Sequence, residues 1–325
     1  MTKFDPERAE WPRSRRLLPA LQKTLEEAVN AQGLLREAAL YHLGRPGKRL
    51  RARLALATAG AFGIPARQML PVAAGVELLH EASLIHDDLQ DRDEERRGAP
   101  TVWHRYGEDT ALLLGDTFLG HALGLLAKGP APLAGELVSL GSKAVQQLAQ
   151  GQLMDLRLTS GSIQDIDRYE TLVRLKTGAL LSLPVSCAAL VGGESAQSAA
   201  SLGDAIGWLG VTYQVLDDLA DLDGTKDRAA GSDYREQRPS AVWLHAGRLN
   251  VHPFQNAHGR ELVREACLAH AASALDKWRR VSAGLPEPPR RVLETAGREL
   301  ALGPCPSSSP MPPLMDNWSI GVLAS

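Results

Sequence analysis

Cysteine is scarce in this chain of 325 residues, which has three, Cys187, Cys267 and Cys305. They are widely spaced and odd in number, which argues against a disulfide framework and a CxxC metal site and for a reducing compartment. Apolar runs of about 18 residues are also missing, so no membrane span is expected. The charged N-terminus, MTKFDPERAEWPRSRR, lacks the apolar run of a signal peptide. We therefore expect a cytoplasmic location.

Charge of one sign is lacking as well. The formal net charge is −2, with 44% hydrophobic and 23% charged residues, which is ordinary for a globular protein. Without a basic field, no nucleic-acid partner is expected. The length is sufficient to bury a large core.

Alternating β-branched patterns are scarce too, whereas alanine and leucine are abundant. Apolar residues recur at helical spacing over residues 17–29, 72–84 and 172–183. Glycine and proline separate the helical runs at residues 44–47, 63–65, 98–100, 129–130 and 192–193. The pattern predicts an all-α, single-domain helical bundle over residues 1–300. A Pro- and Ser-rich C-terminal tail is expected over residues 301–325.

Two acidic stretches of the form DDxxD stand in apolar, helix-compatible sequence, at residues 87–91 and 217–221. On a helix, the first and last aspartates of each stretch share a face. Carboxylates clustered in apolar surroundings repel one another unless a cation neutralises them. All-oxygen ligand sets suit Mg²⁺, which also binds substrate phosphates. The two stretches therefore predict a Mg²⁺–phosphate site built between two helices.

Basic residues near these stretches fit the same site. Lys48 and Arg51 follow a Gly-rich loop and can face one way as a diphosphate clamp, although a basic helix start is more often solvated surface. The pair Arg96-Arg97 fits either a phosphate site or a charge-balanced loop. Lys176 interrupts an apolar helix, where it can bind phosphate or extend its amine to water.

These elements together resemble one family. The run HEASLIHDDLQDRDEERRGAPT (80–101) is similar to the first aspartate-rich motif, HDDxxDxxxxRRGxxT, of trans-isoprenyl diphosphate synthases, the polyprenyl synthetase family. Further matches in the same order are GKRLR (47–51), LLGD (113–116), GQxxD (151–155), KT (176–177) and YQ before the second DDxxD (213–221). The resemblance implies an all-α isoprenoid synthase-like fold around a deep central apolar cavity, and a homodimer.

The resemblance also implies residue roles. Asp87 and Asp91 would bind Mg²⁺ on one side of the allylic diphosphate and Asp217 on the other, with three ions expected. Asp218 and Asp221 would support them, and Asp88 would act indirectly. Residues expected to hold the allylic diphosphate are Arg96, Lys176 and Thr177, with Gln214 near the substrate. Those expected to hold isopentenyl diphosphate are Lys48, Arg51, His80 and Arg97.

The implied reaction is an electrophilic 1'-4 head-to-tail condensation catalysed by a Mg²⁺-dependent prenyltransferase. The allylic C–O bond ionises, the double bond of isopentenyl diphosphate attacks the cation, and a proton is lost with release of diphosphate. A class I terpene cyclase is an alternative, but its second metal motif is not usually DDxxD. A partner subunit of a heteromeric synthase is another, but such subunits often lose one aspartate motif.

Some positions depart from the family pattern or bear on product length. Arg228 and Arg238 stand near positions where the family usually has substrate-binding lysines, and arginine keeps the charge but not the geometry. The residues five and four before Asp87 are the small Ala82 and Ser83, where short-chain members tend to place an aromatic plug. Leu79 and Val76 are the next floor positions on the same helix face. We expect a product of C20 (geranylgeranyl) or longer.

Overall fold

The computed structural model describes residues 10–29, 32–158, 165–224 and 239–302. Its residues form two compact units. The first comprises residues 1–148, 179–204 and 285–293, and the second comprises 149–178, 205–284 and 294–325. The boundary between the units falls within the helices α8 (Ala134–Arg157), α11 (Ala196–Asp223) and α15 (Glu287–Leu302). Each unit is described by itself.

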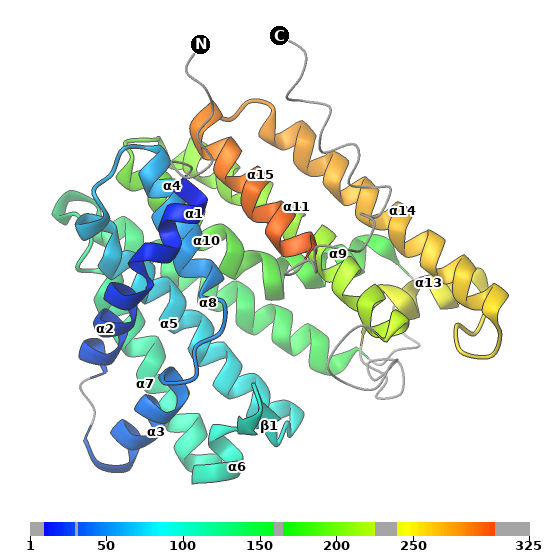
Figure 1. The fold of residues 1–325 in the computed structure, drawn as a ribbon, viewed down its shortest axis with the longest axis horizontal. Coiled ribbons are helices and arrows are strands. Elements are labelled where there is room, and N and C mark those ends of the chain that lie inside the picture. Colours follow the sequence, from blue (N-terminus) through cyan, green and yellow to red (C-terminus); the bar gives the residue numbers. More distant parts are fainter. Residues whose placement is uncertain (1–9, 30–31, 159–164, 225–238, 303–325) are drawn as a thin grey trace. The chain divides into compact units, whose positions relative to one another are not determined.

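The first unit is built around the long helix α5 (Ala66–Asp91), which packs along α7 (Glu108–Leu126) and also contacts α4 (Leu50–Ala61) and α10 (Ala179–Val191) (Figure 1). Gly75 allows the close crossing of α5 and α7, because a Cβ there would lie 2.9 Å from the carbonyl oxygen of Ala122. The remaining elements are α1 (Glu10–Ser14), η2 (Arg15–Leu17), α2 (Leu18–Ala28), α3 (Gly33–Leu43), α6 (Val102–Tyr106) and η3 (Ala131–Leu133). The side chains at the centre of this unit form one apolar core.

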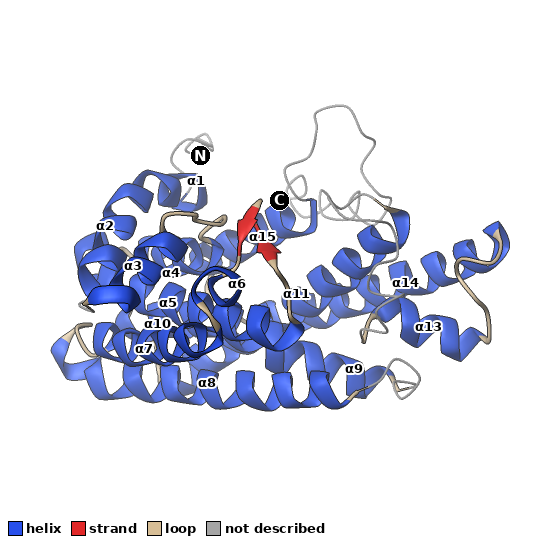
Figure 2. Ribbon diagram, turned by 90° about the horizontal axis from the view of Figure 1, so that it is seen from below, coloured by secondary structure: helices blue, strands red, loops and turns tan. Residues whose placement is uncertain are grey.

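The predicted helix boundaries are confirmed. Each of the Gly/Pro clusters at residues 44–47, 63–65, 129–130 and 192–193 falls between two helices. The fifth, at 98–100, belongs to a feature that sequence periodicity did not predict, the antiparallel hairpin of β1 (Glu95–Arg96) and β2 (Ala99–Pro100), drawn in red in Figure 2. Its two-residue loop, Arg97-Gly98, has positive φ at both positions, +54° and +71°. This is the backbone of a type I′ turn, for which glycine is favoured.

The second unit has its own apolar core, formed by α9 (Ile166–Val173), α13 (Ala241–Leu249), α14 (Ala257–Ser282) and the adjoining parts of α8 and α11. Between α9 and α10 the chain makes a π-helical turn, η5 (Arg174–Gly178). Side-chain caps begin α9, α13 and α14: the Asp165 carboxylate accepts from the Asp167 N–H, the Ser240 hydroxyl from the Trp243 N–H, and the Asn256 side chain from the Gly259 N–H.

The all-α prediction is confirmed, since the described residues contain two short strands and otherwise helices and connections. One described stretch, Ile166–Val191, is long and apolar enough to cross a membrane, but 72% of its apolar window is buried inside the protein. This burial is what a core helix of a globular protein has. The predicted tail lies outside the described residues from position 303 onward.

Candidate active site

The first DDxxD stretch occupies the C-terminal turn of α5, which ends at Asp91. Asp87 and Asp91 are half-buried, whereas Asp88 between them is buried. The helix stops there because Arg92 takes the left-handed conformation, with φ +59°. Negative charge is disfavoured at the C-terminal end of a helix, where the carbonyl dipoles already point outward. This turn is therefore one that cations stabilise.

Asp88 holds Arg96 of the hairpin. One carboxylate oxygen, Asp88 Oδ1, accepts from Arg96 Nε at 2.6 Å and lies 2.5 Å from Arg96 Nη2. Burial raises the pKa of Asp88, although its hydrogen bond to Arg96 opposes that shift. The contact gives Asp88 a structural task, that of orienting a guanidinium which remains about one-third exposed.

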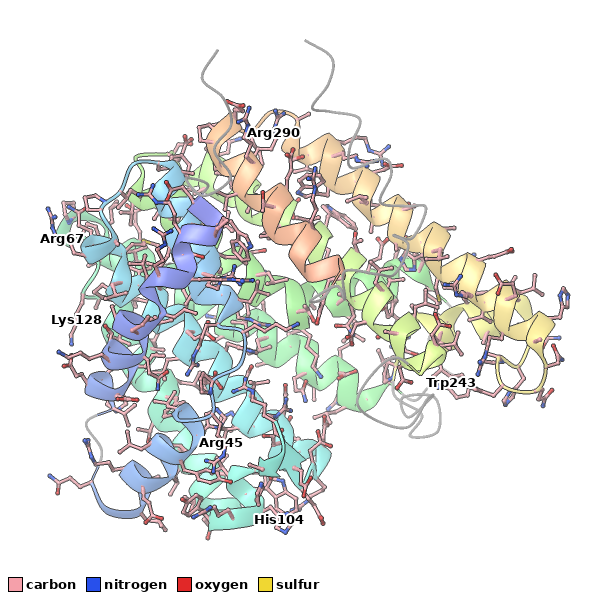
Figure 3. All side chains as sticks on the ribbon, viewed as in Figure 1. Arg45, Arg67, His104, Lys128, Trp243 and Arg290 are labelled. Atoms are coloured by element: carbon pink, nitrogen blue, oxygen red, sulfur yellow. The ribbon has the colours of Figure 1, made fainter. Side chains whose placement is uncertain are left out.

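Arg97, the next residue, is turned toward the loop between α3 and α4. Its Nη1 donates to the carbonyl oxygen of Arg45 at 2.6 Å, and Arg45 is labelled in Figure 3. A Cβ on Gly47 would lie 2.6 Å from Arg97 Nη2. Glycine in the GKRLR segment therefore makes room for this guanidinium, and the hairpin contacts the basic loop.

The first turn of α4, which follows this loop, meets α5 through Arg51 and His80. Arg51 Nη1 lies 3.0 Å from His80 Nε2. Burial and the neighbouring Arg51 charge lower the pKa of His80 well below its ordinary value, so the ring is neutral near pH 7 and its Nε2 accepts the bond. Lys48, in the loop before α4, is exposed. Arg51 thus contacts His80 of α5, and Arg97 lies 3.7 Å from Glu81, the next residue of that helix. Their role as a diphosphate clamp stays a prediction.

The LLGD element (113–116) packs against His86, the residue before the first aspartate of the DDxxD stretch. His86 Nε2 lies 3.2 Å from the carbonyl oxygen of Leu112 and 3.7 Å from Asp116 Oδ1. A Cβ on Gly115 would lie 2.1 Å from His86 Nε2. Glycine therefore leaves room for the imidazole, which any larger residue at position 115 would push aside.

The second DDxxD stretch lies near the end of α11 in the second unit. Asp217 is half-buried, whereas Asp218 and Asp221 are buried. Asp218 Oδ2 accepts from the Tyr169 hydroxyl and from the Ala241 N–H, both at 2.7 Å. Asp218 Oδ1 accepts from Gln214 Nε2 at 2.9 Å. Burial raises the pKa of Asp218 to about 7. Its hydrogen bonds join α9, α11 and the start of α13 within this unit.

The KT pair sits in the π-helical turn η5, a local irregularity frequent at functional sites. Lys176 Nζ donates to Asp155 Oδ2 at 2.5 Å, and Thr177 Oγ1 lies 3.4 Å from Gln214 Oε1. Gly151 allows α8 to approach the turn, because a Cβ there would lie 2.7 Å from the Lys176 amide nitrogen. The GQxxD, KT and YQ elements, separate in sequence, therefore meet in this unit.

The expected product-length residues lie on α5. Ala82, Leu79 and Val76 are fully buried, whereas Ser83 is half-buried and donates to the carbonyl oxygen of His80 at 2.8 Å. Their role stays a prediction. Arg228 and Arg238 lie outside the described residues.

Sequence reasoning missed four buried polar residues beside the basic cluster, His42, Arg49, Glu77 and Glu81. Glu77 and Glu81 are one helical turn apart within an apolar helix, and that spacing was a usable signal. Their contacts are described below.

The aspartates fit Mg²⁺ by donor chemistry, since half-buried carboxylates at a helix C-terminus supply oxygen ligands and negative charge. Among the described residues, no three His, Cys, Asp or Glu side chains gather closely enough to hold a metal ion by themselves. The remaining ligands would then be waters and substrate phosphate oxygens, the usual arrangement for this cation. Two aspartate-rich helix ends and clustered basic side chains in an all-helical protein are typical of one class of enzymes, those that handle diphosphates with the help of a metal ion.

Comparison with known proteins gives the family. The family model described as polyprenyl synthetase matches residues 32–275. The short chain isoprenyl diphosphate synthase of Methanocaldococcus jannaschii is 33% identical over 234 residues, 71% of this chain and 71% of that protein. The geranylgeranyl diphosphate synthase of Methanosarcina mazei is 32% identical over 218 residues, 65% and 67% of the two chains. Farnesyl and geranylfarnesyl diphosphate synthases are also among the relatives.

Solved structures agree on the fold. The geranylgeranyl pyrophosphate synthetase of the archaeon Geoglobus acetivorans superposes with a TM-score of 0.78 at 24% identity, over 90% of this chain and 99% of that one. The chain belongs to the polyprenyl synthetase family and is a trans-prenyltransferase. The family is Mg²⁺-dependent and uses isopentenyl diphosphate and an allylic diphosphate.

Proposed function

We propose that this prenyltransferase condenses isopentenyl diphosphate with an allylic prenyl diphosphate to give a product of C20 or longer. The observation that carries the proposal is that Arg51 contacts His80, and Arg97 lies 3.7 Å from the adjacent Glu81, on the α5 helix that ends in the first DDxxD stretch. Cations gathered in this way can hold a diphosphate whose own charge would otherwise keep a second diphosphate away.

The proposed residue roles are those that the family resemblance implies, and burial and contacts support them. Lys48, Arg51, His80 and Arg97 hold isopentenyl diphosphate. Residues proposed to hold the allylic diphosphate are Arg96, Lys176, Thr177 and Gln214. We assign Asp87, Asp91 and Asp217 as metal ligands because they are the half-buried aspartates of the two stretches. The buried aspartates Asp88, Asp218 and Asp221 support them, and three Mg²⁺ ions are proposed in all.

Mg²⁺ held by Asp87, Asp91 and Asp217 would supply positive charge to neutralise the negative charge that develops on the departing diphosphate. Arg96, held by Asp88, adds fixed positive charge for the same group. Lys176 can contribute another, once its ammonium is shared between Asp155 and a phosphate oxygen. No side-chain nucleophile is used, and the released diphosphate takes the proton.

Product length is proposed to depend on α5. The small Ala82 and Ser83 leave room for a growing chain, and Leu79 and Val76 follow on the same face as its floor. Relatives named for geranylgeranyl and geranylfarnesyl products, C20 and C25, support this range, although others are named for farnesyl. We also propose a cytoplasmic homodimer, by analogy with the family.

The test is direct. The purified chain is incubated with Mg²⁺, isopentenyl diphosphate and each allylic diphosphate from C5 to C20, and product lengths are measured. We expect elongation to C20 or beyond. Products that stop at C15 would refute the length assignment, and no elongation with any starter would refute the proposed function.

A further inference from the structure

A single buried carboxylate, Glu81 of α5, ties together three segments around the basic cluster. Its Oε1 accepts from Arg49 Nη1 at 2.5 Å. Its Oε2 lies 2.7 Å from His42 Nε2 and 3.7 Å from Arg97 Nη1. These partners come from the loop before α4, from α3 and from the β-hairpin. The side chain is only 1% exposed, so it cannot touch a substrate.

This carboxylate is charged despite its burial. Desolvation alone would raise the pKa of Glu81, but the hydrogen bond to His42 and the charge of Arg49 hold that pKa below its ordinary value. Glu77, one turn earlier, differs: burial raises its pKa, and its Oε2 accepts from the Ala52 N–H at 2.9 Å. Glu81 also makes the shorter of two carboxylate contacts to Arg49 Nη1, 2.5 Å against 3.6 Å for Glu77 Oε1.

Arg49 transmits this contact to the clamp. It lies between Lys48 and Arg51 and has a left-handed backbone, with φ +49°, which is strained for a residue with a Cβ. Its guanidinium also donates to Gln22 Oε1 at 3.0 Å and to the carbonyl oxygen of Leu43. These contacts, together with the carboxylates of Glu81 at 2.5 Å and Glu77 at 3.6 Å from Arg49 Nη1, hold the backbone that directs its two basic neighbours.

Arg97 is affected directly. It is 28% exposed on its side chain, so one end of the guanidinium reaches solvent while Nη1 faces Glu81 and the Arg45 carbonyl oxygen. Without Glu81, the guanidinium groups of Arg49 and Arg97 and the basic residues beside them would repel one another in partly desolvated surroundings.

We propose, resting on the proposed function above, that Glu81 is a positioning residue for isopentenyl diphosphate. It preorganises Lys48, Arg51 and Arg97 without touching the substrate. Binding of the homoallylic diphosphate then requires little rearrangement of these cations. The allylic diphosphate, assigned to other residues, does not depend on Glu81.

The test is Glu81→Gln, which keeps the shape and removes the charge. We expect KM for isopentenyl diphosphate to rise about tenfold, because charge-assisted bonds that fix the cluster are lost, while KM for the allylic substrate stays within a factor of two. Thermal shift by isopentenyl diphosphate alone gives a second readout, and it should shrink. The matched control is Glu170→Gln, another buried carboxylate, paired with Lys277 at 2.6 Å in the second unit. It should lower stability without raising KM for isopentenyl diphosphate.

The outcomes separate the hypotheses. Unchanged KM for isopentenyl diphosphate, or an equal rise for both substrates, would overturn the positioning role while leaving the prenyltransferase intact. Absence of elongation by the wild-type chain would instead overturn the proposed function. If Glu81→Gln does not fold, Glu81→Asp decides, since it keeps the charge but withdraws it by one methylene. It should raise KM for isopentenyl diphosphate about threefold, and an unchanged value would refute the proposal.

Discussion

Replacing Gly151 by alanine tests whether close packing of α8 on the π-helical turn η5 holds Lys176 in place. The added Cβ would lie 2.7 Å from the Lys176 amide nitrogen, 2.9 Å from the Leu175 carbonyl carbon and 3.0 Å from the Leu175 Cβ. Two of these are backbone atoms, which cannot swing aside as a flexible side chain does. The turn must therefore move away from α8.

The magnitude combines two opposing effects. Overpacking of this kind costs about 1–3 kcal/mol, whereas glycine to alanine inside a helix gains up to about 1 kcal/mol. We expect a net loss of about 1 kcal/mol in the free energy of unfolding. Because Lys176 is paired with Asp155 across the same contact, displacement by about 1 Å should lower kcat/KM on the order of 100-fold.

The matched control is Gly120→Ala in α7, a mid-helix glycine whose added Cβ would meet nothing within 4 Å. It has the same propensity gain without the clash, so the difference between the two variants isolates the steric effect. Urea unfolding and steady-state kinetics measure both. Equal stabilities would refute the packing argument, and full activity in a destabilised Gly151→Ala protein would refute the role of Lys176.

Three further predictions follow from the same structure. Burial, with help from the His270 and Arg248 charges, lowers the pKa of His245 to about 4, so the unfolded chain binds more protons between pH 6.5 and 4. The free energy of unfolding should fall by up to about 3 kcal/mol as pH drops through that window. Urea titrations at several pH values should show a weaker pH dependence of that free energy for His245→Gln, and equal pH dependences in the two proteins would contradict the assignment. Ala82→Phe or Ser83→Phe should shorten the product, measured by chromatography of the hydrolysed prenols, and an unchanged distribution would refute the floor on α5. Chelation of Mg²⁺ should abolish condensation while leaving the helical circular dichroism signal unchanged, because an apolar core holds each unit.

Much of the fold was predictable because it depends on local chemistry. Helical periodicity and Gly/Pro punctuation predicted where helices begin and end, since both act within a few residues. Periodicity did not predict the hairpin because each of its strands has only two residues, too few to show an alternating pattern. Its turn signal, Arg97-Gly98, was present in the sequence, but it was interpreted as part of a motif.

The site was predictable to a different depth. Spacing within each DDxxD stretch is enough to place its first and last aspartates on one face of a helix. Which aspartate is buried is not local information, because burial depends on what packs against the helix. The spacing therefore does not show that Asp218 is buried and Asp217 half-buried, whereas the contacts of Asp218 with Tyr169 and Ala241 do.

By itself, the sequence determined the helical class, the two aspartate-rich stretches and the order of the basic elements that identify the family. Only the tertiary structure decided which side chains of these elements contact one another. In the structure, the Arg97 guanidinium packs against Gly47, and Lys176 forms an ion pair with Asp155. Three segments contact the carboxylate of Glu81. The physical reason is that charge and hydrogen-bond partners far apart in the chain are chosen by packing, which no local pattern encodes.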